Sequence, residues 1–297
     1  RLNHRRSVMD AMSLIESTLT TAMLRAETGG GPPKLAAAMR HAVFPRGARV
    51  RPRLCLAVAS ACGADRFDAA VAAGAALEFL HCASLVHDDL PCFDDAATRR
   101  GRPSVHAAFG APIAVLAGDA LIVLAFQTLA LGCAVQPGPV IALSGIVAEA
   151  VGMPGGIVAG QAWESEDEVD LARYQRAKTS ALFAAAAMAG AASAGEDPLP
   201  WRALGDNLGD AYQIADDLCD AAGDAASCGK PVGRDAALHR PSAVRRFGIE
   251  GALDLLDEVA ERAASSIPDC PGVASLRALI VQEAKRLVPK GLARAAA

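Results

Sequence analysis

The stretch VAAGAALEFLHCASLVH, residues 71–87, is almost unbroken apolar sequence, and two aspartates follow it directly. A helix that is apolar around its whole circumference lies in the interior of a large protein rather than on its surface. The run ALFAAAAMAGAASA, residues 181–194, has the same character. Both stretches therefore predict interior helices of a large helical bundle.

The rest of the chain repeats this pattern of apolar runs and breaks. Runs of ten to twenty residues are separated by Gly- and Pro-containing turns at residues 28–33, 136–139, 152–156 and 195–200. No segment alternates apolar and polar residues as a half-buried strand would. We expect an all-α fold, a single large bundle of roughly ten or more helices. No linker divides the sequence, so residues 1–297 are expected to form one domain.

Composition excludes several classes of protein. The 297 residues are 52% hydrophobic, and their formal net charge of −4 argues against a nucleic-acid partner. The eight cysteines form no Cys-x-x-Cys pair, so neither a zinc site nor a redox motif is predicted. Reduced cysteines and the lack of a visible signal peptide favour a cytoplasmic protein.

Residues 120–148 carry no formal charge and resemble a membrane span at first sight. Gln127 and the turn at residues 136–139 break the stretch into pieces shorter than the ~20 apolar residues that a spanning helix needs. We therefore expect two buried helices joined by a turn and no integral membrane segment.

Two clusters of aspartates each follow an apolar, helix-like run. The candidate ligands are Asp88, Asp89 and Asp94 in the first cluster and Asp216, Asp217 and Asp220 in the second. Carboxylates this close together repel one another unless protons, basic side chains or a metal ion neutralise them. Donor sets made of oxygen select hard ions such as Mg²⁺. The two clusters therefore predict a magnesium site presented by two helices.

Spacing differs between the clusters. Asp216 and Asp220 are four residues apart and share one helix face. Asp88 and Asp94 are six apart, but Pro91 is expected to distort the helix end and let Asp94 turn back. The alternative, solvated charges at two helix C-termini, would oppose the helix dipole and cost stability.

Basic residues supply the other half of a diphosphate site. Arg99, Arg100 and Arg102 follow the first cluster, and Arg51 lies in a separate turn-like segment. Magnesium held by carboxylates, together with arginines, is suited to binding a diphosphate. Taken alone, residues 99–102 could equally be a solvated loop.

With these motifs in place, the chain resembles the trans-isoprenyl diphosphate synthases, or polyprenyl synthetases, over nearly its whole length. Residues 88–94 followed by 99–101 are similar to the first aspartate-rich signature of the family, and residues 213–220 to its second. Four further signatures occur in the family order, at residues 44–52, 160–161, 178–179 and 229–230.

The resemblance implies a fold around a deep central cavity, usually in a homodimer, and a condensation of isopentenyl diphosphate with an allylic diphosphate. It implies three Mg²⁺ ions, with Asp88, Asp94 and Asp216 as the principal ligands. The residues implied for the allylic diphosphate are Arg99, Lys178, Thr179, Gln213, Lys230 and Arg240, and those for isopentenyl diphosphate are Arg51, His81 and Arg100. Judged without the resemblance, His81 in its apolar helix is more often a hydrogen-bonded core residue than a ligand.

Three departures from the family pattern occur. Ala96 and Ala97 replace acidic residues that often follow the first aspartate signature, and the other two departures concern cations. Ala48 stands where the family usually has a lysine for isopentenyl diphosphate, and Arg46 or Arg49 is a possible substitute. Arg240 stands at a common lysine position and keeps the charge.

The resemblance also implies the length of the product. Ala83 and Ser84, five and four residues before Asp88, are expected to point into the cavity, where an aromatic residue at position 83 would stop growth at C15. Small residues there and the four-residue spacer at 90–93 favour a geranylgeranyl diphosphate synthase, with C20 as the main product.

Three alternatives remain open. A farnesyl diphosphate (C15) synthase is the nearest. A terpene cyclase would use a similar cavity, although the second diphosphate site favours a condensation. A non-catalytic subunit that modulates a partner synthase is favoured slightly by Ala48 and opposed by the intact aspartate motifs.

Overall fold

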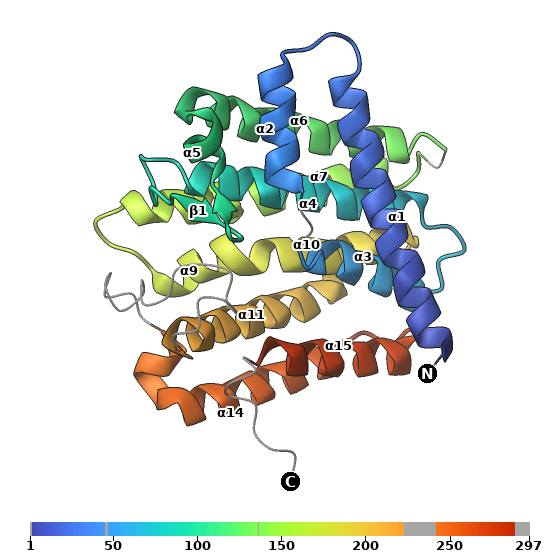
Figure 1. Ribbon diagram of the computed structural model, residues 1–297. Helices are drawn as coiled ribbons and strands as arrows, with labels where there is room; N and C mark the ends of the chain where they lie inside the picture. Colours follow the sequence, from blue (N-terminus) through green and yellow to red (C-terminus); the bar gives the residue numbers. More distant parts are fainter. Residues whose placement is uncertain (1, 45–46, 136, 223–241, 289–297) are drawn as a thin grey trace.

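The computed structural model describes residues 2–44, 47–135, 137–222 and 242–288 (Figure 1). The expected all-α architecture is confirmed. The α-helices are α1 (Leu2–Glu27), α2 (Pro33–Val43), α3 (Val50–Ala61), α4 (Asp68–Asp88), α5 (Val105–Phe109), α6 (Ala111–Gly132), α7 (Val140–Val151), α8 (Ile157–Ala162), α9 (Leu171–Gln175), α10 (Ala181–Ser193), α11 (Arg202–Ala222), α14 (Ala243–Ser265) and α15 (Val273–Leu287). Short 3-10 turns lie at Trp163–Ser165 (η1) and Leu199–Trp201 (η3), and a π-turn at Arg176–Ser180 (η2).

Helices α4 and α10 form the centre of the bundle, as their sequences predict. Most of α4 is buried, including Glu78 and Asp88, and α10 is buried from Ala181 to Ala192. Helix α4 packs against α6 and α3, whereas α10 packs against α3 and α11. In Figure 1, α11, α14 and α15 lie below these central helices. The C-terminal end of α4 and the middle of α11 thus come from opposite sides of one interior space.

A short hairpin follows the first aspartate cluster, where the sequence left open a solvated loop. Strand β1 (Thr98–Arg99) pairs antiparallel with β2 (Arg102–Pro103). The two residues between the strands, Arg100 and Gly101, have φ of 53° and 72°. Two consecutive positive φ angles match the twist of a tight hairpin. This turn fixes the directions of Arg100 and of the preceding Arg99.

Helices α6 and α7 confirm the prediction of two helices joined by a turn. The argument that both helices are too short to span a membrane was wrong. Helix α6 is continuous from Ala111 and spans 22 residues. By length and composition, it and α4 could each cross a membrane. Helix α4 is 83% buried within its most apolar window and is therefore a core helix, whereas the window of α6 is only 44% buried. The exposed half of α6 needs a separate explanation.

Cysteine chemistry also differs from expectation at one position. Cys55, Cys62, Cys82 and Cys133 are free and buried, which fits small apolar fillers. Cys219, inside the second aspartate cluster, is disulfide-bonded. The expectation that every cysteine is reduced is therefore wrong at this residue.

Candidate active site

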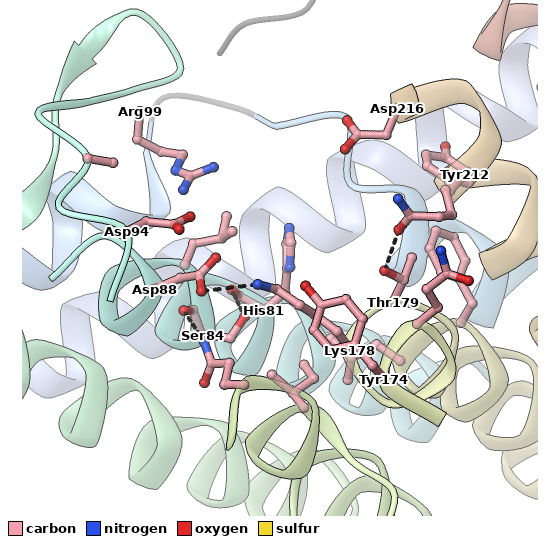
Figure 2. A pocket seen from close by; sticks show the side chains of 18 of the residues that line it. His81, Ser84, Asp88, Asp94, Arg99, Tyr174, Lys178, Thr179, Tyr212 and Asp216 are labelled. Atoms are coloured by element: carbon pink, nitrogen blue, oxygen red, sulfur yellow. Dashed lines mark hydrogen bonds and ion pairs between the residues drawn. The ribbon is translucent and has the colours of Figure 1, made fainter. Parts of the chain in front are cut away.

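A cavity of about 380 Å³ lies between α4, α8, η2, α10 and α11. Apolar side chains contribute to its wall on one side, including Leu85, Ile157, Leu182 and Phe183. Its polar wall carries acids from both aspartate clusters, and Figure 2 shows Asp88 and Asp94 across the space from Asp216. The predicted meeting of the two clusters around one cavity is therefore what the structure shows.

The turn after α4 brings Asp94 back beside Asp88. Helix α4 ends at Asp88, and the amide of Asp94 donates to the Asp88 carbonyl at 2.9 Å. Asp88 is 8% exposed, and burial raises the pKa of its carboxyl although the Lys178 ammonium opposes the shift. A buried carboxylate facing another acid is an unfavourable arrangement that a bound cation relieves.

Asp89 faces away from this cavity. Its carboxylate accepts hydrogen bonds from Arg99, with Nη2 at 2.5 Å and Nε at 3.0 Å from Oδ1. Asp89 is 2% exposed and lines a small neighbouring hollow instead. The structure therefore makes Asp89 the residue that orients Arg99, which itself lines the cavity.

In the second cluster, the three aspartates of α11 all border the cavity, but Asp217 is held by the protein. Its Oδ2 accepts from the amide of Ala243 at 2.7 Å, and its Oδ1 from Gln213 Nε2 at 3.0 Å. Ala243 is the first residue of α14, so Asp217 caps that helix. Asp216 and Asp220 are the better candidates for ligands.

Lys178 and Thr179 enter the cavity from the π-turn η2, an irregularity that often marks functional sites. The close approach of α8 requires glycine at 160, because a Cβ there would lie 2.6 Å from the Lys178 amide nitrogen. Thr179 donates to Gln213 Oε1 at 3.1 Å (Figure 2). Gln213 in turn holds Asp217, so the predicted Thr179 and Gln213 form one connected group.

Two residues of the second predicted diphosphate site line the same cavity. Arg51 and His81 both line it, and the Arg51 guanidinium stacks 4.6 Å from the centre of the Phe183 ring. The Nε of Arg51 is buried with no partner among the described residues. Because Arg51 lines the cavity, its guanidinium is suited to receiving an anion there.

The electrostatic surroundings of His81 are compatible with an anion site beside Arg51. Burial, and then the positive charges of Arg51 and Arg100, hold the pKa of the His81 imidazole well below its ordinary value. The ring is therefore neutral near pH 7 and can donate one N–H. Arg100 borders the neighbouring hollow and leans over Gly47, where a Cβ would lie 3.0 Å from its Nη2. The three residues predicted for isopentenyl diphosphate thus surround adjoining spaces.

Arg49 is not a substitute for the lysine missing at Ala48. Its side chain is fully buried and pairs with Glu78 at 2.7 Å and Glu16 at 3.0 Å, with a further bond to the Val43 carbonyl. This internal ion pair was not predicted from the sequence. Arg46 lies outside the described residues. So do Lys230 and Arg240, which are two of the residues predicted for the allylic diphosphate.

Of the two residues predicted to control product length, one lines the cavity. Ser84 borders it, and its carbonyl accepts from Gln161 Nε2 at 3.0 Å. Ala83 is 1% exposed and belongs to the hydrophobic core, outside the cavity wall. The positions differ because Ala83 lies on the opposite side of α4 from Asp88 at 100° per residue.

The carboxylates fit Mg²⁺ in kind but do not form a closed site alone. Asp88, Asp94 and Asp216 supply the hard oxygen donors that Mg²⁺ prefers. In the part of the chain that the structure describes, no three acidic, His or Cys side chains come close enough to hold an ion. Additional oxygen ligands, from water or from a diphosphate, would complete the coordination.

An all-α bundle with opposed aspartates around one cavity defines a class, because the solved structures that share this fold are isoprenyl synthases. A geranylgeranyl pyrophosphate synthase structure superposes with a TM-score of 0.80 over 94% of this chain and 97% of that one, at 23% identity. A farnesyl/geranylfarnesyl diphosphate synthase from Zymomonas mobilis superposes with a TM-score of 0.76 over 95% and 100%, at 31% identity.

Sequence comparison narrows the class to one family. The sequence model of the polyprenyl synthetase family matches residues 32–270. A geranylgeranyl diphosphate synthase of Cereibacter sphaeroides is 50% identical over 279 residues, which cover 94% of this chain and 97% of that protein. Another, of Rhodobacter capsulatus, is 50% identical over 92% and 95%. The chain belongs to the polyprenyl synthetase family.

Proposed function

We propose that the chain is a Mg²⁺-dependent prenyltransferase that condenses isopentenyl diphosphate with an allylic diphosphate and makes mainly geranylgeranyl diphosphate. One observation carries this proposal: acids from α4 and α11 face each other across a cavity that Arg51, Arg99 and Lys178 also line. Geranylgeranyl diphosphate synthases at 50% identity support it.

One end of the cavity binds the allylic diphosphate. Lys178 and Arg99 contact its oxygens, and Asp88, Asp94 and Asp216 hold the metal. A solved geranyltransferase of Helicobacter pylori with magnesium and isoprenyl diphosphate, 25% identical to this chain, supports the use of this ion. Bound Mg²⁺ supplies positive charge that stabilises the leaving diphosphate. Three ions are proposed, and Asp216 would hold the third.

Arg51, His81 and Arg100 hold isopentenyl diphosphate, so that its double bond faces the allylic carbon. When the allylic C–O bond breaks, its electron pair leaves with the diphosphate. The double bond of isopentenyl diphosphate then attacks the allylic cation and forms the new C–C bond. Loss of one proton to the released diphosphate restores a double bond, and the longer allylic diphosphate is the product.

The apolar part of the cavity receives the growing chain. Leu85, Ile157 and Leu182 line it, and Ser84 leaves room beside them. No aromatic residue occupies position 83 or 84. Growth past C15 is therefore sterically open, which favours C20 over the farnesyl alternative.

A homodimer is part of this proposal because α6 has two apolar faces. One packs on α4 and α2, and the other exposes large side chains in a helical stripe. The exposed stripe, with its neighbour on α7, consists of Leu116 at 51%, Val123 at 56%, Phe126 at 36% and Ile141 at 84% exposure. An apolar patch of this kind marks an interface. A single domain and a cytoplasmic location remain predictions.

Labelled isopentenyl diphosphate tests the reaction class. Purified protein with an allylic diphosphate and Mg²⁺ should incorporate the label into a longer prenyl diphosphate, and EDTA should abolish incorporation. A cyclase would consume the allylic substrate without incorporating the label. A modulating subunit would show no turnover without a partner, and either result would overturn the proposal.

A further inference from the structure

Lys178 lies between two carboxylates and is closer to the one outside the predicted metal site. Its Nζ is 2.5 Å from Glu164 Oε1 and 3.4 Å from Asp88 Oδ1. The ammonium thus lies between the two acids and is shared unequally, with the shorter contact to Glu164.

Tyr174 fixes Glu164, the acid closer to Lys178. Its hydroxyl donates to the same Glu164 Oε1 at 2.6 Å, so one oxygen receives both donors. Glu164, Tyr174 and Lys178 come from three successive short elements, η1, α9 and η2. The side chains of Glu164 and Lys178 are 20% and 22% exposed, so water screens the pair only partly. This geometry holds the ammonium on the Glu164 side of the cavity.

The position of the ammonium matters because Asp88 has to be available to a cation. A lysine in full contact with Asp88 would compete with Mg²⁺ for the same oxygens. We propose that Glu164, fixed by Tyr174, is a positioning residue that keeps the Lys178 ammonium off Asp88 and so leaves this carboxylate open to a divalent cation. This inference rests on the proposed function, in which Asp88 is a metal ligand.

Uptake of a cation then requires little rearrangement. When Asp88 turns to the metal, Lys178 keeps Glu164 as its counter-charge and is not left as a buried unpaired ammonium. The flexible lysine stem can later bring the ammonium to a diphosphate, and the contact with a proposed metal ligand that it gives up is the long 3.4 Å one with Asp88.

Binding of Mn²⁺ to the substrate-free protein, measured from the electron paramagnetic resonance signal of the free ion, tests the inference. Glu164→Gln should weaken Mn²⁺ binding roughly three- to tenfold, since the ammonium loses its charged partner and moves to Asp88. Glu164→Asp should regain part of the affinity. Tyr174→Phe removes no charge and should shift binding in the same direction by less. The control Glu166→Gln, an equal charge change at an exposed position two residues away, should stay within about twofold of the wild type.

A double-mutant cycle separates positioning from a direct effect on the ion. In a Lys178→Gln background the competitor is gone, so Glu164→Gln should change Mn²⁺ affinity by less than about twofold. If the loss persists in that background, Glu164 acts on the ion itself and the inference is overturned. Equal affinities of the wild type and Glu164→Gln, or no Mn²⁺ uptake by the wild type, also overturn it. Failure of the proposed function would appear separately, as no incorporation of labelled isopentenyl diphosphate by the wild type.

Discussion

Neighbouring aspartates in the two clusters have different surroundings and therefore different roles. Asp88 and Asp216 border the cavity, where they suit a cation. Asp89 orients Arg99, and Asp217 caps α14. In both Asp-Asp pairs, the first carboxylate borders the cavity, whereas the second is held by other groups of the protein.

Replacing Asp216 and Asp217 separately should distinguish these roles. Asp216→Asn should lower turnover roughly 10²- to 10³-fold with little change in melting temperature, because it removes charge from the metal site. Asp217→Ala leaves the Ala243 amide and Gln213 without their acceptor and should cost about 2 kcal/mol of stability. Thermal unfolding and steady-state kinetics of both variants measure this, and equal melting temperatures would contradict the capping role.

In the proposed isopentenyl diphosphate site, Ala48 stands where the family usually has a lysine, so we expect the site to be one cation short. Among the described arginines nearby, Arg49 is bound to Glu78, and Arg102 to the Phe44 carbonyl and His41. Ala48→Lys should therefore lower the KM for isopentenyl diphosphate roughly three- to tenfold and change the KM for the allylic substrate little. An unchanged KM for isopentenyl diphosphate would show that the cation is supplied from elsewhere.

At the residue scale, the sequence predicts which side chains lie at the cavity better than it predicts their contacts. Asp88, Lys178 and Arg51 reach the cavity as expected. The partners of Asp89 and Asp217 were not predicted, because each depends on a contact across 10 or more residues. Glu164 and Tyr174 were missed for the same reason, since neither belongs to a cluster that spacing alone reveals.

Among the elements, α4 connects the metal site to the space for the product. It presents Asp88 at its C-terminal end and Ser84 one turn below, on the same face. Ala83 lies on the opposite side, within the core. We therefore expect the depth open to a prenyl chain to depend on the residue at 84.

Ser84→Phe should shorten the main product, because the new ring would occupy the cavity one turn below Asp88. The sequence predicts the same shortening for Ala83→Phe, but the structure adds a cost there, since the ring has to enter a packed core and should lower stability by about 1–3 kcal/mol. Product chromatography and thermal unfolding of both variants distinguish the two positions. A Ser84→Phe enzyme with an unchanged product would contradict the cavity assignment.

Long apolar helices were predictable, whereas short irregular elements were not. The interiors of α4 and α10 follow from hydrophobicity that does not depend on partners. The hairpin at β1 and β2 and the π-turn η2 depend on tertiary packing and on turn geometry. These two elements carry Arg99 and Lys178, so the directions of both cations came only from the structure.

At the scale of the whole molecule, α6 carries more large apolar side chains than the single chain covers. It is buried on one side only, although both sides carry large aliphatic residues. The sequence analysis did not predict the exposed apolar side of α6, because it expected two buried helices in this region. A second copy of the chain would cover it and explain why the surface has kept these residues apolar.

Ile141→Glu places a charge in this proposed interface and should weaken self-association at least about tenfold. Light scattering during gel filtration at decreasing protein concentration measures the mass. The control Leu199→Glu changes an equally apolar residue, 65% exposed, on η3 and should leave the mass unchanged. A wild-type protein that is monomeric at all concentrations would contradict the interface.

Chromatography of the dephosphorylated products tests the central claim most directly. Wild-type protein is incubated with isopentenyl diphosphate, Mg²⁺ and dimethylallyl, geranyl or farnesyl diphosphate in turn. A condensing enzyme with an open cavity should give geranylgeraniol as the main alcohol from each starter. A dominant farnesol peak with little geranylgeraniol would contradict the C20 assignment, and no prenyl alcohol longer than the starter would contradict the condensation itself.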